Sequence, residues 1–342
     1  MAKLDIKALF AERKLRAVLV IAVVTYFLVF QVLYNTFWKP STSTKRFLFA
    51  DGAPWLNFWK SDSQPTKENE LVHIHGEDQT LRHSQGQIGG HVDPGKSGRT
   101  SVAIGGGITS KRLDKSAIHH MYEKFQFFKV FLPSFCQTAS AGYDYHFYLA
   151  YDSTDALFSD NEFLAAFQKT FVDMIAAVCS DLGTVSLHLV ECSHAGKPAW
   201  AQNDAMLEAY LDNVDYHYRI NDDTVMKTKD WTRTFIETLN ALDPPRVGVV
   251  GPNHSGGNTA ILTYDFVHRT HVDIFGFYYP RLFTDWFADG WITRTYRPDR
   301  CKKLPDVLLV HTLGLGQRYH VKGNIGNLQA PRVLADKVIL DR

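Results

Sequence analysis

Short apolar runs separated by helical patterns follow residue 100, and this alternation restricts the possible folds more than any other feature of the sequence. The runs combine β-branched and aromatic residues and lie at 101–105, 145–151, 184–190, 215–220, 246–250 and 306–310. Helical patterns cover about 113–131, 160–179, 200–212 and 229–241. Strands that alternate with helices form a mainly parallel sheet with helices on both faces. The sequence therefore predicts one α/β domain over residues 100–342.

The N-terminal part of the chain has a different character. Residues 17–34 carry no charged side chain, and this length is near the lower limit for a membrane-spanning helix. Basic residues outnumber acidic ones in residues 1–16, which is typical of a cytoplasmic flank. We expect a tail over 1–16, a transmembrane anchor over 17–36 and a polar stem over 37–99. A cleaved signal peptide is the alternative, but the run is long for one and no A-x-A-like site follows it.

The overall composition is that of a globular protein, with 45% apolar and 21% charged residues. The net charge of +1 gives no indication of nucleic-acid binding. The cysteines are Cys136, Cys179, Cys192 and Cys301, and none form a CxxC pair. They allow three complete pairings, among which the sequence does not choose.

Residues 90–97, GHVDPGKS, match the phosphate-binding pattern G-x-x-x-x-G-K-[ST]. A working P-loop lies between a buried strand and a helix that begins at its Lys-Ser. Here the preceding HSQGQIG is polar, and the following segment is strand-like and rich in glycine. The stretch resembles the phosphate loop of translation GTPases, but no D-x-x-G or N-K-x-D motif supports this. We interpret it as stem; a P-loop nucleoside triphosphatase, which would depend on Lys96, is an alternative.

The predicted strand at 215–220 ends at Asn221, Asp222 and Asp223. Ligands of such sheets bind beyond the carboxyl ends of the strands. Adjacent carboxylates there suit a hard divalent cation whose coordination is completed by substrate phosphates and water. An Asx-rich turn is the alternative explanation. His311, directly after the strand at 306–310, is a candidate for a further ligand, although a lone histidine is often structural.

Residues 196–226 resemble the donor-site segment of GT-A-fold glycosyltransferases, in which a helix precedes a strand that ends in a DxD-type motif. The matching positions are Gly196, Asn203, Ala209 and Asn221-Asp222-Asp223, and Asn221 departs from the acidic first position. The resemblance extends over about residues 100–320 and implies a single Rossmann-like GT-A domain. It also implies Mn²⁺ or Mg²⁺ held by Asp223, with Asp222 and His311. For Asp222 two roles are open: it would face the sugar or the ribose of the donor, or it would share the metal with Asp223.

The same resemblance implies which residues bind the donor. Thr109, Ser110, Lys111, Asp152, Asn203 and Asp222 are the expected donor-binding residues. Gly105 to Gly107 would let the backbone approach the nucleotide closely. Asp155 is a further candidate contact, and a helix N-cap is the alternative for both Asp152 and Asp155.

Two aspartates lie in the aromatic segment 275–296, and an acid in a similar place deprotonates the acceptor in the resembling family. Asp289 is the expected general base, with Asp285 second. On a helix the two would share one face, and aromatic surroundings would raise a carboxylate pKa. A capped surface turn packed by Trp286 and Trp291 is the alternative. The expected acceptor-binding residues are Gly256, Gly257, Asn258, Trp286 and Trp291. Asn253 begins a glycosylation sequon, and a glycan there would crowd this site.

Together these features predict a metal-dependent glycosyltransferase of the hexosyl or N-acetylhexosaminyl class. The donor would be a nucleotide sugar, with a UDP-sugar favoured, and the acceptor a glycan on protein or lipid, with inversion at the anomeric carbon. The order of anchor, stem and domain is that of single-pass type II Golgi proteins with a luminal catalytic domain. A membrane-tethered, lectin-like protein without turnover is the alternative. The sugar, nucleotide and acceptor are not determined by the sequence.

Overall fold

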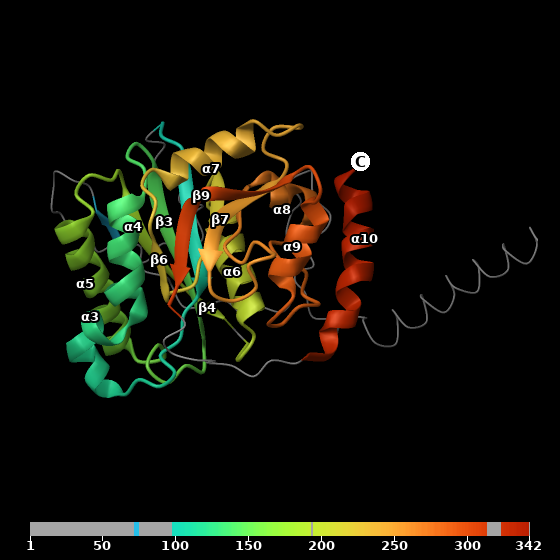
Figure 1. The fold of residues 1–342 in the computed structure, drawn as a ribbon. Coiled ribbons are helices and arrows are strands. Elements are labelled where there is room, and N and C mark those ends of the chain that lie inside the picture. Colours follow the sequence, from blue (N-terminus) through green and yellow to red (C-terminus); the bar gives the residue numbers. More distant parts are fainter. Residues whose placement is uncertain (1–71, 75–97, 193, 313–322, 342) are drawn as a thin grey trace, which may run out of the picture. The chain divides into compact units, whose positions relative to one another are not determined.

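The structure is a computed structural model that describes residues 72–74, 98–192, 194–312 and 323–341. All of them belong to one compact unit, Trp55–Arg342, whereas the unit Met1–Pro54 lies outside the described residues. The described strands form a nine-stranded sheet in the order β1-β4-β3-β2-β5-β8-β7-β9-β6 (Figure 1). The strands are β1 (Val72–Ile74), β2 (Ser101–Gly107), β3 (Asp144–Asp152), β4 (Val185–Cys192), β5 (Tyr216–Arg219), β6 (Thr224–Met226), β7 (Val249–Ser255), β8 (Phe266–His268) and β9 (Cys301–His311).

The four central strands β4, β3, β2 and β5 are parallel. Their register places Val102 of β2 between Tyr145 of β3 and Tyr216 of β5. β8 is antiparallel to β5, and β6 is antiparallel to β9. The predicted α/β class, with a Rossmann-like parallel core, is confirmed by this arrangement.

Helices cover both faces of the parallel strands. The helical elements are η1 (Lys115–His120), α3 (Met121–Lys124), η2 (Phe127–Phe131), α4 (Leu132–Thr138), α5 (Asn161–Val178), α6 (Pro198–Leu211), α7 (Trp231–Asn240), α8 (Thr270–Phe275), α9 (Ala288–Tyr296), η3 (Gly323–Leu328) and α10 (Gln329–Leu340). Three of the predicted helices correspond to α5, α6 and α7. The predicted helix at 113–131 is instead divided into η1, α3 and η2, and α4 follows with Pro133 in its first turn.

Alternate residues of β3 explain how the two layers form, because successive side chains in a strand point to opposite faces. Phe147 and Leu149 belong to a large cluster rich in phenylalanine that includes residues of α4 and α5. Tyr148 and Ala150 pack instead with the alanines of α6, namely Ala201, Ala205 and Ala209. Figure 1 shows α4 and α5 on one side of the strands and α6 on the other.

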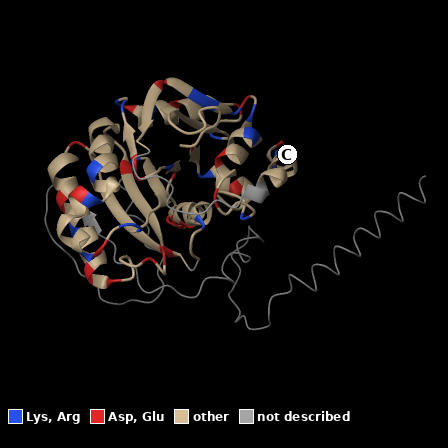
Figure 2. Cartoon of the chain, turned by 60° about the horizontal axis from the view of Figure 1, so that its bottom comes forward, with Lys and Arg blue, Asp and Glu red and all other residues tan. Residues whose placement is uncertain are grey.

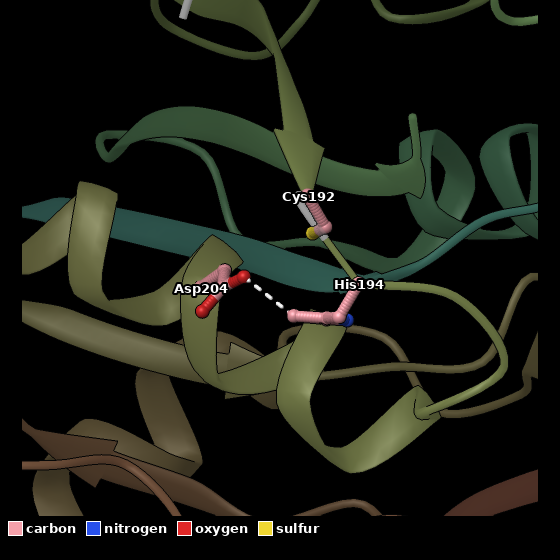
Figure 3. A group of neighbouring side chains, drawn as sticks. All are labelled: Cys192, His194 and Asp204. Atoms are coloured by element: carbon pink, nitrogen blue, oxygen red, sulfur yellow. Dashed lines mark hydrogen bonds and ion pairs between the residues drawn. The ribbon is translucent and has the colours of Figure 1, made fainter. Parts of the chain in front are cut away.

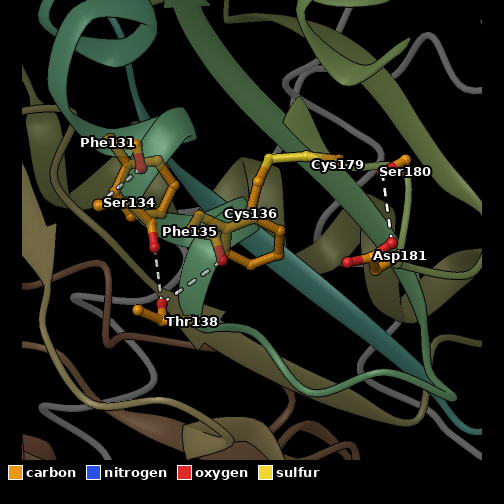
Figure 4. The surroundings of a disulfide bond; sticks show 8 residues. All are labelled: Phe131, Ser134, Phe135, Cys136, Thr138, Cys179, Ser180 and Asp181. Atoms are coloured by element: carbon orange, nitrogen blue, oxygen red, sulfur yellow. Dashed lines mark hydrogen bonds between the residues drawn. A yellow bond between two sulfur atoms is a disulfide. The ribbon is translucent and has the colours of Figure 1, made fainter. Parts of the chain in front are cut away.

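One disulfide joins the two helices of the phenylalanine-rich layer. Cys136 of α4 is bonded to Cys179, the residue that caps α5, with 4.8 Å between their Cα atoms (Figure 4). Among the described residues, Cys192 and Cys301 are free cysteines. The structure therefore selects one pairing that the sequence left open. Closing a loop of 43 residues restricts the unfolded chain, which corresponds to about 4 kcal/mol in the chain-entropy treatment.

Some expectations differ from the structure or lie outside it. Val72–Ile74, within the predicted stem, forms an edge strand antiparallel to β4. Within the described part of the chain, no helix has both the length and the apolar character needed to cross a membrane. The predicted tail and anchor, residues 1–36, and the stretch GHVDPGKS lie outside the described residues.

Candidate active site

The turn between β5 and β6 contains the predicted metal-binding residues. Asp222 is 4% exposed and Asp223 is 8% exposed. β6 pairs with the end of β9, so that Thr224 lies opposite His311. This pairing brings His311 Nε2 to 3.1 Å from Asp223 Oδ1, although the two residues are distant in the sequence. The structure thus brings two of the three predicted ligands into contact, and their role as ligands stays a prediction.

Backbone contacts hold this turn in place without using the carboxylates. Thr312 donates to the carbonyl oxygen of Asp223 from its amide, at 3.0 Å, and from its hydroxyl, at 2.8 Å. Thr224 Oγ1 donates to the carbonyl oxygen of Asn221 at 2.8 Å. Buried carboxylates are unfavourable unless they are paired or bind a cation. The carboxylate oxygens of Asp222 and Asp223 fit Mn²⁺ or Mg²⁺, since such ions prefer oxygen ligands and keep positions for phosphate and water.

A buried tyrosine lies beside this pair. The ring of Tyr264 is fully buried, and its centroid is 6.1 Å from that of His311 in an edge-to-face arrangement. Burial raises the pKa of the Tyr264 hydroxyl, and the charges of Asp223 and Asp289 raise it further. Tyr264 thus lies beside His311, and its chain neighbour Thr263 donates to Asp289 at the start of α9. It marks the region where the expected metal ligands and the expected base approach each other.

Asp289 lies in the first turn of α9. Its Oδ1 accepts a hydrogen bond from the amide of Gly290 at 2.8 Å, and its Oδ2 accepts from Thr263 Oγ1 at 3.3 Å. Phe287, just before the helix, has a φ of 75°, an uncommon value for a bulky residue. Its carbonyl oxygen accepts from Gln329 Nε2 at 2.7 Å. This strained turn fixes the direction in which α9 begins, and so the position of Asp289.

The expectation that Asp285 and Asp289 share a helix face is wrong, because α9 begins only at Ala288. Asp285 belongs to the preceding turn, where Oδ1 accepts from the amide of Trp286 at 2.5 Å and Oδ2 accepts from Thr284 Oγ1 at 3.3 Å. Asp289 accepts a hydrogen bond from Thr263, the neighbour of Tyr264 in the chain, and so lies beside the region of Asp223 and His311. The geometry therefore favours Asp289 as the candidate base.

A buried polar network that the sequence did not reveal lies behind this region. Asp265 is fully buried and accepts hydrogen bonds from the hydroxyls of Tyr278 and Tyr279, each at 2.5 Å. Burial raises the pKa of Asp265 to about 6, although the two hydrogen bonds and Arg219 act in the opposite direction. Arg219, the last residue of β5, also donates to the carbonyl oxygen of Thr263 at 2.5 Å. A lone Asp between aromatic residues carries no sequence signal for such a network.

The loop after β2 is held by Asp155. Asp155 Oδ2 accepts from Thr109 Oγ1 at 2.8 Å and from the amide of Ser110 at 2.9 Å. Its Oδ1 accepts from the Ser110 hydroxyl and from the amides of Leu157 and Phe158. Asp155 therefore stabilises two loops, and the N-cap of α5 is Asp160 instead. Lys111, the next expected donor-binding residue, is exposed.

The other expected donor-binding residues have structural contacts as well. Asp152 Oδ2 accepts from the amide of Gly196 at 2.8 Å. Asn203 is 1% exposed, and its Oδ1 accepts from the amides of Tyr278 and Tyr279 at 2.9 and 3.3 Å. Asn203 thus supports the segment that carries the tyrosines of the buried network. Its expected contact with a donor stays a prediction.

A glycine of β2 has a packing role. A Cβ on Gly106 would lie 2.5 Å from the carbonyl oxygen of Ile220, the residue after β5. By contrast, a Cβ on Gly107 would meet its nearest atom, the Ala201 Cβ, at 3.4 Å. The close approach of two neighbouring segments therefore explains Gly106, whereas we had expected the glycines to make room for a nucleotide.

The expected acceptor residues divide into exposed and buried groups. Trp286 is 53% exposed, and Gly257 and Asn258 are exposed in the loop after β7. Gly256 is half-buried, and both glycines have positive φ values, 84° and 70°. Trp291 is fully buried, and its Nε1 donates to Asp336 Oδ2 of α10 at 2.8 Å. The expectation that Trp291 contacts an acceptor is therefore wrong, because it is a core residue between α9 and α10.

No family model matches this chain, and no curated protein matches it. Among solved structures, the chain is similar to the glucosyl-3-phosphoglycerate synthase of Mycobacterium tuberculosis in complex with Mg²⁺ and uridine diphosphate. The identity is 10% and the TM-score 0.39, over 76% of this chain and 85% of that chain. At such values, the likeness carries no inference about what this chain binds or does.

Proposed function

We propose that this chain is a metal-dependent glycosyltransferase that moves a sugar from a nucleotide sugar, a UDP-sugar first of all, to a hydroxyl of a glycan acceptor. The observation that carries the proposal is the distance of 3.1 Å between Asp223 Oδ1 and His311 Nε2. This pair lies where β5 and β9 end, and ligands of α/β sheets bind beyond the ends of their strands. Asp222, buried beside Asp223, supplies a further carboxylate.

The roles of the residues follow from their positions. Asp223, Asp222 and His311 would hold Mn²⁺ or Mg²⁺, which as a Lewis acid neutralises charge on the leaving nucleoside diphosphate. Asp289 would accept the proton of the acceptor hydroxyl as its oxygen attacks the anomeric carbon. The hydrogen bond from Thr263 to Asp289 and the ring contact between Tyr264 and His311 support the presence of both groups in one site, because Thr263 and Tyr264 are neighbours in the chain. A base on the acceptor side corresponds to inversion at the anomeric carbon.

A binding protein without turnover is the second candidate. Asn221 favours it, because an amide stands where a DxD-type motif has its first carboxylate. Such a protein would bind a nucleotide sugar with a cation but would not release the nucleoside diphosphate.

For the cellular location, we propose a single-pass type II protein of the Golgi or another secretory membrane, anchored by residues 17–36, with the domain in the lumen. The disulfide between Cys136 and Cys179 supports this proposal, because disulfides persist in oxidising compartments and are rare in the cytosol. Attachment of a glycan at Asn253, detected as a loss of mass on enzymatic deglycosylation, would establish luminal exposure and would at the same time argue against residues 256–258 as acceptor contacts. Asn253 is exposed, as a glycosylation site has to be.

The proposed function is tested by calorimetric titration of the full chain in detergent with UDP and then GDP, with and without Mn²⁺. We expect binding that requires Mn²⁺ and that Asp223→Asn abolishes. Asn keeps the side-chain volume, and the contacts of Thr312 go to the backbone oxygen of residue 223, so the turn is expected to remain folded. Asp306→Asn is the matched control, since Asp306 is exposed on β9 and has the same charge.

Two outcomes contradict the proposal. If neither UDP nor GDP binds, with or without Mn²⁺, the chain has no nucleotide-sugar site. If the Asp223→Asn variant binds the nucleotide as tightly as the unmodified chain does, Asp223 is not a metal ligand. If binding is present, Asp289→Asn separates the two candidates: for a transferase, release of UDP from UDP-sugars should be lost in this variant while UDP still binds.

A further inference from the structure

A second group of metal-binding side chains lies at the end of β4, which β3 and β2 separate from β5 in the sheet. Cys192 is the last residue of β4, His194 follows in the next loop, and Asp204 belongs to α6. One ligand atom of each lies within 4.8 Å of the others. Figure 3 shows the Cys192 sulfur close to the pair formed by His194 and Asp204. The group therefore has its own place in the fold, apart from Asp223 and His311.

The distances suit a small tetrahedral ion. His194 Nε2 lies 2.9 Å from Asp204 Oδ2. With metal–ligand bonds of about 2.0 Å, two such atoms in a tetrahedral zinc shell are about 3.3 Å apart. A thiolate and an imidazole would be about 3.6 Å apart, so the sulfur, which lies within 4.8 Å of the other two atoms, would move by at most about 1.2 Å to bind the same ion. The arrangement is therefore close to one that a bound ion would impose.

Burial supports a ligand-binding role for the group. Cys192 is 1% exposed, and the side chains of His194 and Asp204 are 10% and 16% exposed. Within the described part of the chain, the buried Nδ1 of His194 has no hydrogen-bond partner. The contact between His194 and Asp204 leaves that nitrogen without a partner among the described residues, and the Cys192 thiol has one long contact, of 4.0 Å, to the carbonyl oxygen of Val190. A bound cation would use the thiol and fix the imidazole ring.

The chemical nature of the three side chains selects the class of metal. A thiolate and an imidazole suit Zn²⁺ and similar ions, whereas Mg²⁺ and Mn²⁺ prefer oxygen ligands. Burial, followed by the nearby carboxylate of Asp204, raises the pKa of the Cys192 thiol. A thiol in such surroundings is not an activated nucleophile, which requires a lowered pKa. Binding of the metal would displace the thiol proton to solvent and form a metal–sulfur bond.

We propose that Cys192, His194 and Asp204 form a site for a zinc-class divalent cation, with the fourth position open to water. The site would fasten the loop after β4 to α6. That loop also contains Gly196, whose amide donates to Asp152. The proposal does not depend on the proposed glycosyltransferase activity, since it concerns different residues and a different class of metal.

The site is tested by titrating the full chain in detergent, without reductant so that the disulfide between Cys136 and Cys179 stays closed, with Co²⁺, a spectroscopic substitute for Zn²⁺. We expect a near-ultraviolet band of thiolate-to-cobalt charge transfer, which excess Zn²⁺ removes. Cys192→Ser should lose the band, and Cys301→Ser, the matched variant of the other free cysteine, should retain it. Histidines of the stem can bind Co²⁺ too, but they give no thiolate band. Circular dichroism of the metal-free variants checks that each is folded.

A second variant keeps the proposal testable if Cys192→Ser does not fold. Asp204→Asn retains the sulfur, and we expect it to weaken Co²⁺ binding at least about tenfold. Absence of the band in the unmodified chain overturns the proposal, and so does a band that persists in Cys192→Ser or disappears in Cys301→Ser. Unchanged affinity in Asp204→Asn would also overturn it, because the carboxylate would then not be a ligand.

Discussion

Replacing Asp155 with asparagine should separate a supporting role of this residue from direct contact with a donor. Asp155 is 8% exposed, and its carboxylate joins the loop after β2 to the turn after β3. Its two oxygens accept hydrogen bonds from both loops, including three backbone amides, those of Ser110, Leu157 and Phe158. Asparagine has the same shape but only one oxygen, so its NH₂ group must face part of this set of donors.

The asparagine amide can take two orientations, and the expected loss of stability is worked out for the one that disturbs fewer hydrogen bonds. With the amide oxygen in place of Oδ1, the NH₂ group faces Thr109 Oγ1, which can rotate its hydroxyl, and the amide of Ser110, which cannot. One charge-assisted hydrogen bond is lost, about 1.5–3 kcal/mol, and one buried amide is unsatisfied, about 1–3 kcal/mol. We therefore expect the free energy of unfolding to fall by roughly 3–5 kcal/mol. For a domain of this size, Tm should fall by roughly 6–20 °C.

Urea denaturation followed by tryptophan fluorescence measures this difference. Asp152→Asn is the control, because Asp152 is half-buried and accepts one bond, from the exposed Gly196. We expect this control to lose less than about 1 kcal/mol. If Asp155→Asn is as stable as the unmodified chain but binds UDP more weakly, Asp155 contacts the donor directly and the reasoning from its hydrogen bonds is refuted.

Three further predictions concern other parts of the domain. Gly106→Ala should destabilise the fold by about 1–3 kcal/mol through its contact with the Ile220 carbonyl, and Gly107→Ala by less than about 1 kcal/mol; equal denaturation midpoints would contradict this. Since burial raises the pKa of Asp265 from 3.8 to about 6, its contribution to stability is complete below pH 3.8 and is lost as the pH rises through 6. The stability of the unmodified chain relative to Asp265→Asn should therefore fall by roughly 1 kcal/mol between pH 5 and 7, whereas a constant difference in denaturation midpoints would argue against a raised pKa. His311→Gln should weaken Mn²⁺-dependent UDP binding by at least about tenfold in calorimetry, and unchanged affinity would exclude His311 as a ligand.

The order of strands and helices could be predicted from the sequence, because periodicity is local. Each central strand was visible as an apolar run, and α5, α6 and α7 lie near their predicted ranges. Shorter elements were missed, such as β8 with three residues, since so short a run has no periodicity of its own. Helix α9 was misread for a related reason: the spacing of Asp285 and Asp289 suggests one helix face, but nothing local reveals the turn at Phe287.

For the candidate site, the residues Asp222, Asp223, His311 and Asp289 were chosen from the sequence alone, because polar residues after a strand are expected at the ligand-binding edge of an α/β sheet. Only the tertiary structure decided how close they are. The contact between Asp223 and His311 depends on the pairing of β6 with β9, a non-local register that no short stretch of sequence encodes. The fold also decided which residues are buried, since Trp291 lies in the core. Cys192, His194 and Asp204 lie close together because α6 packs across the end of β4. The sequence determined which chemistry is present at the strand ends, and long-range packing determined which of those groups meet.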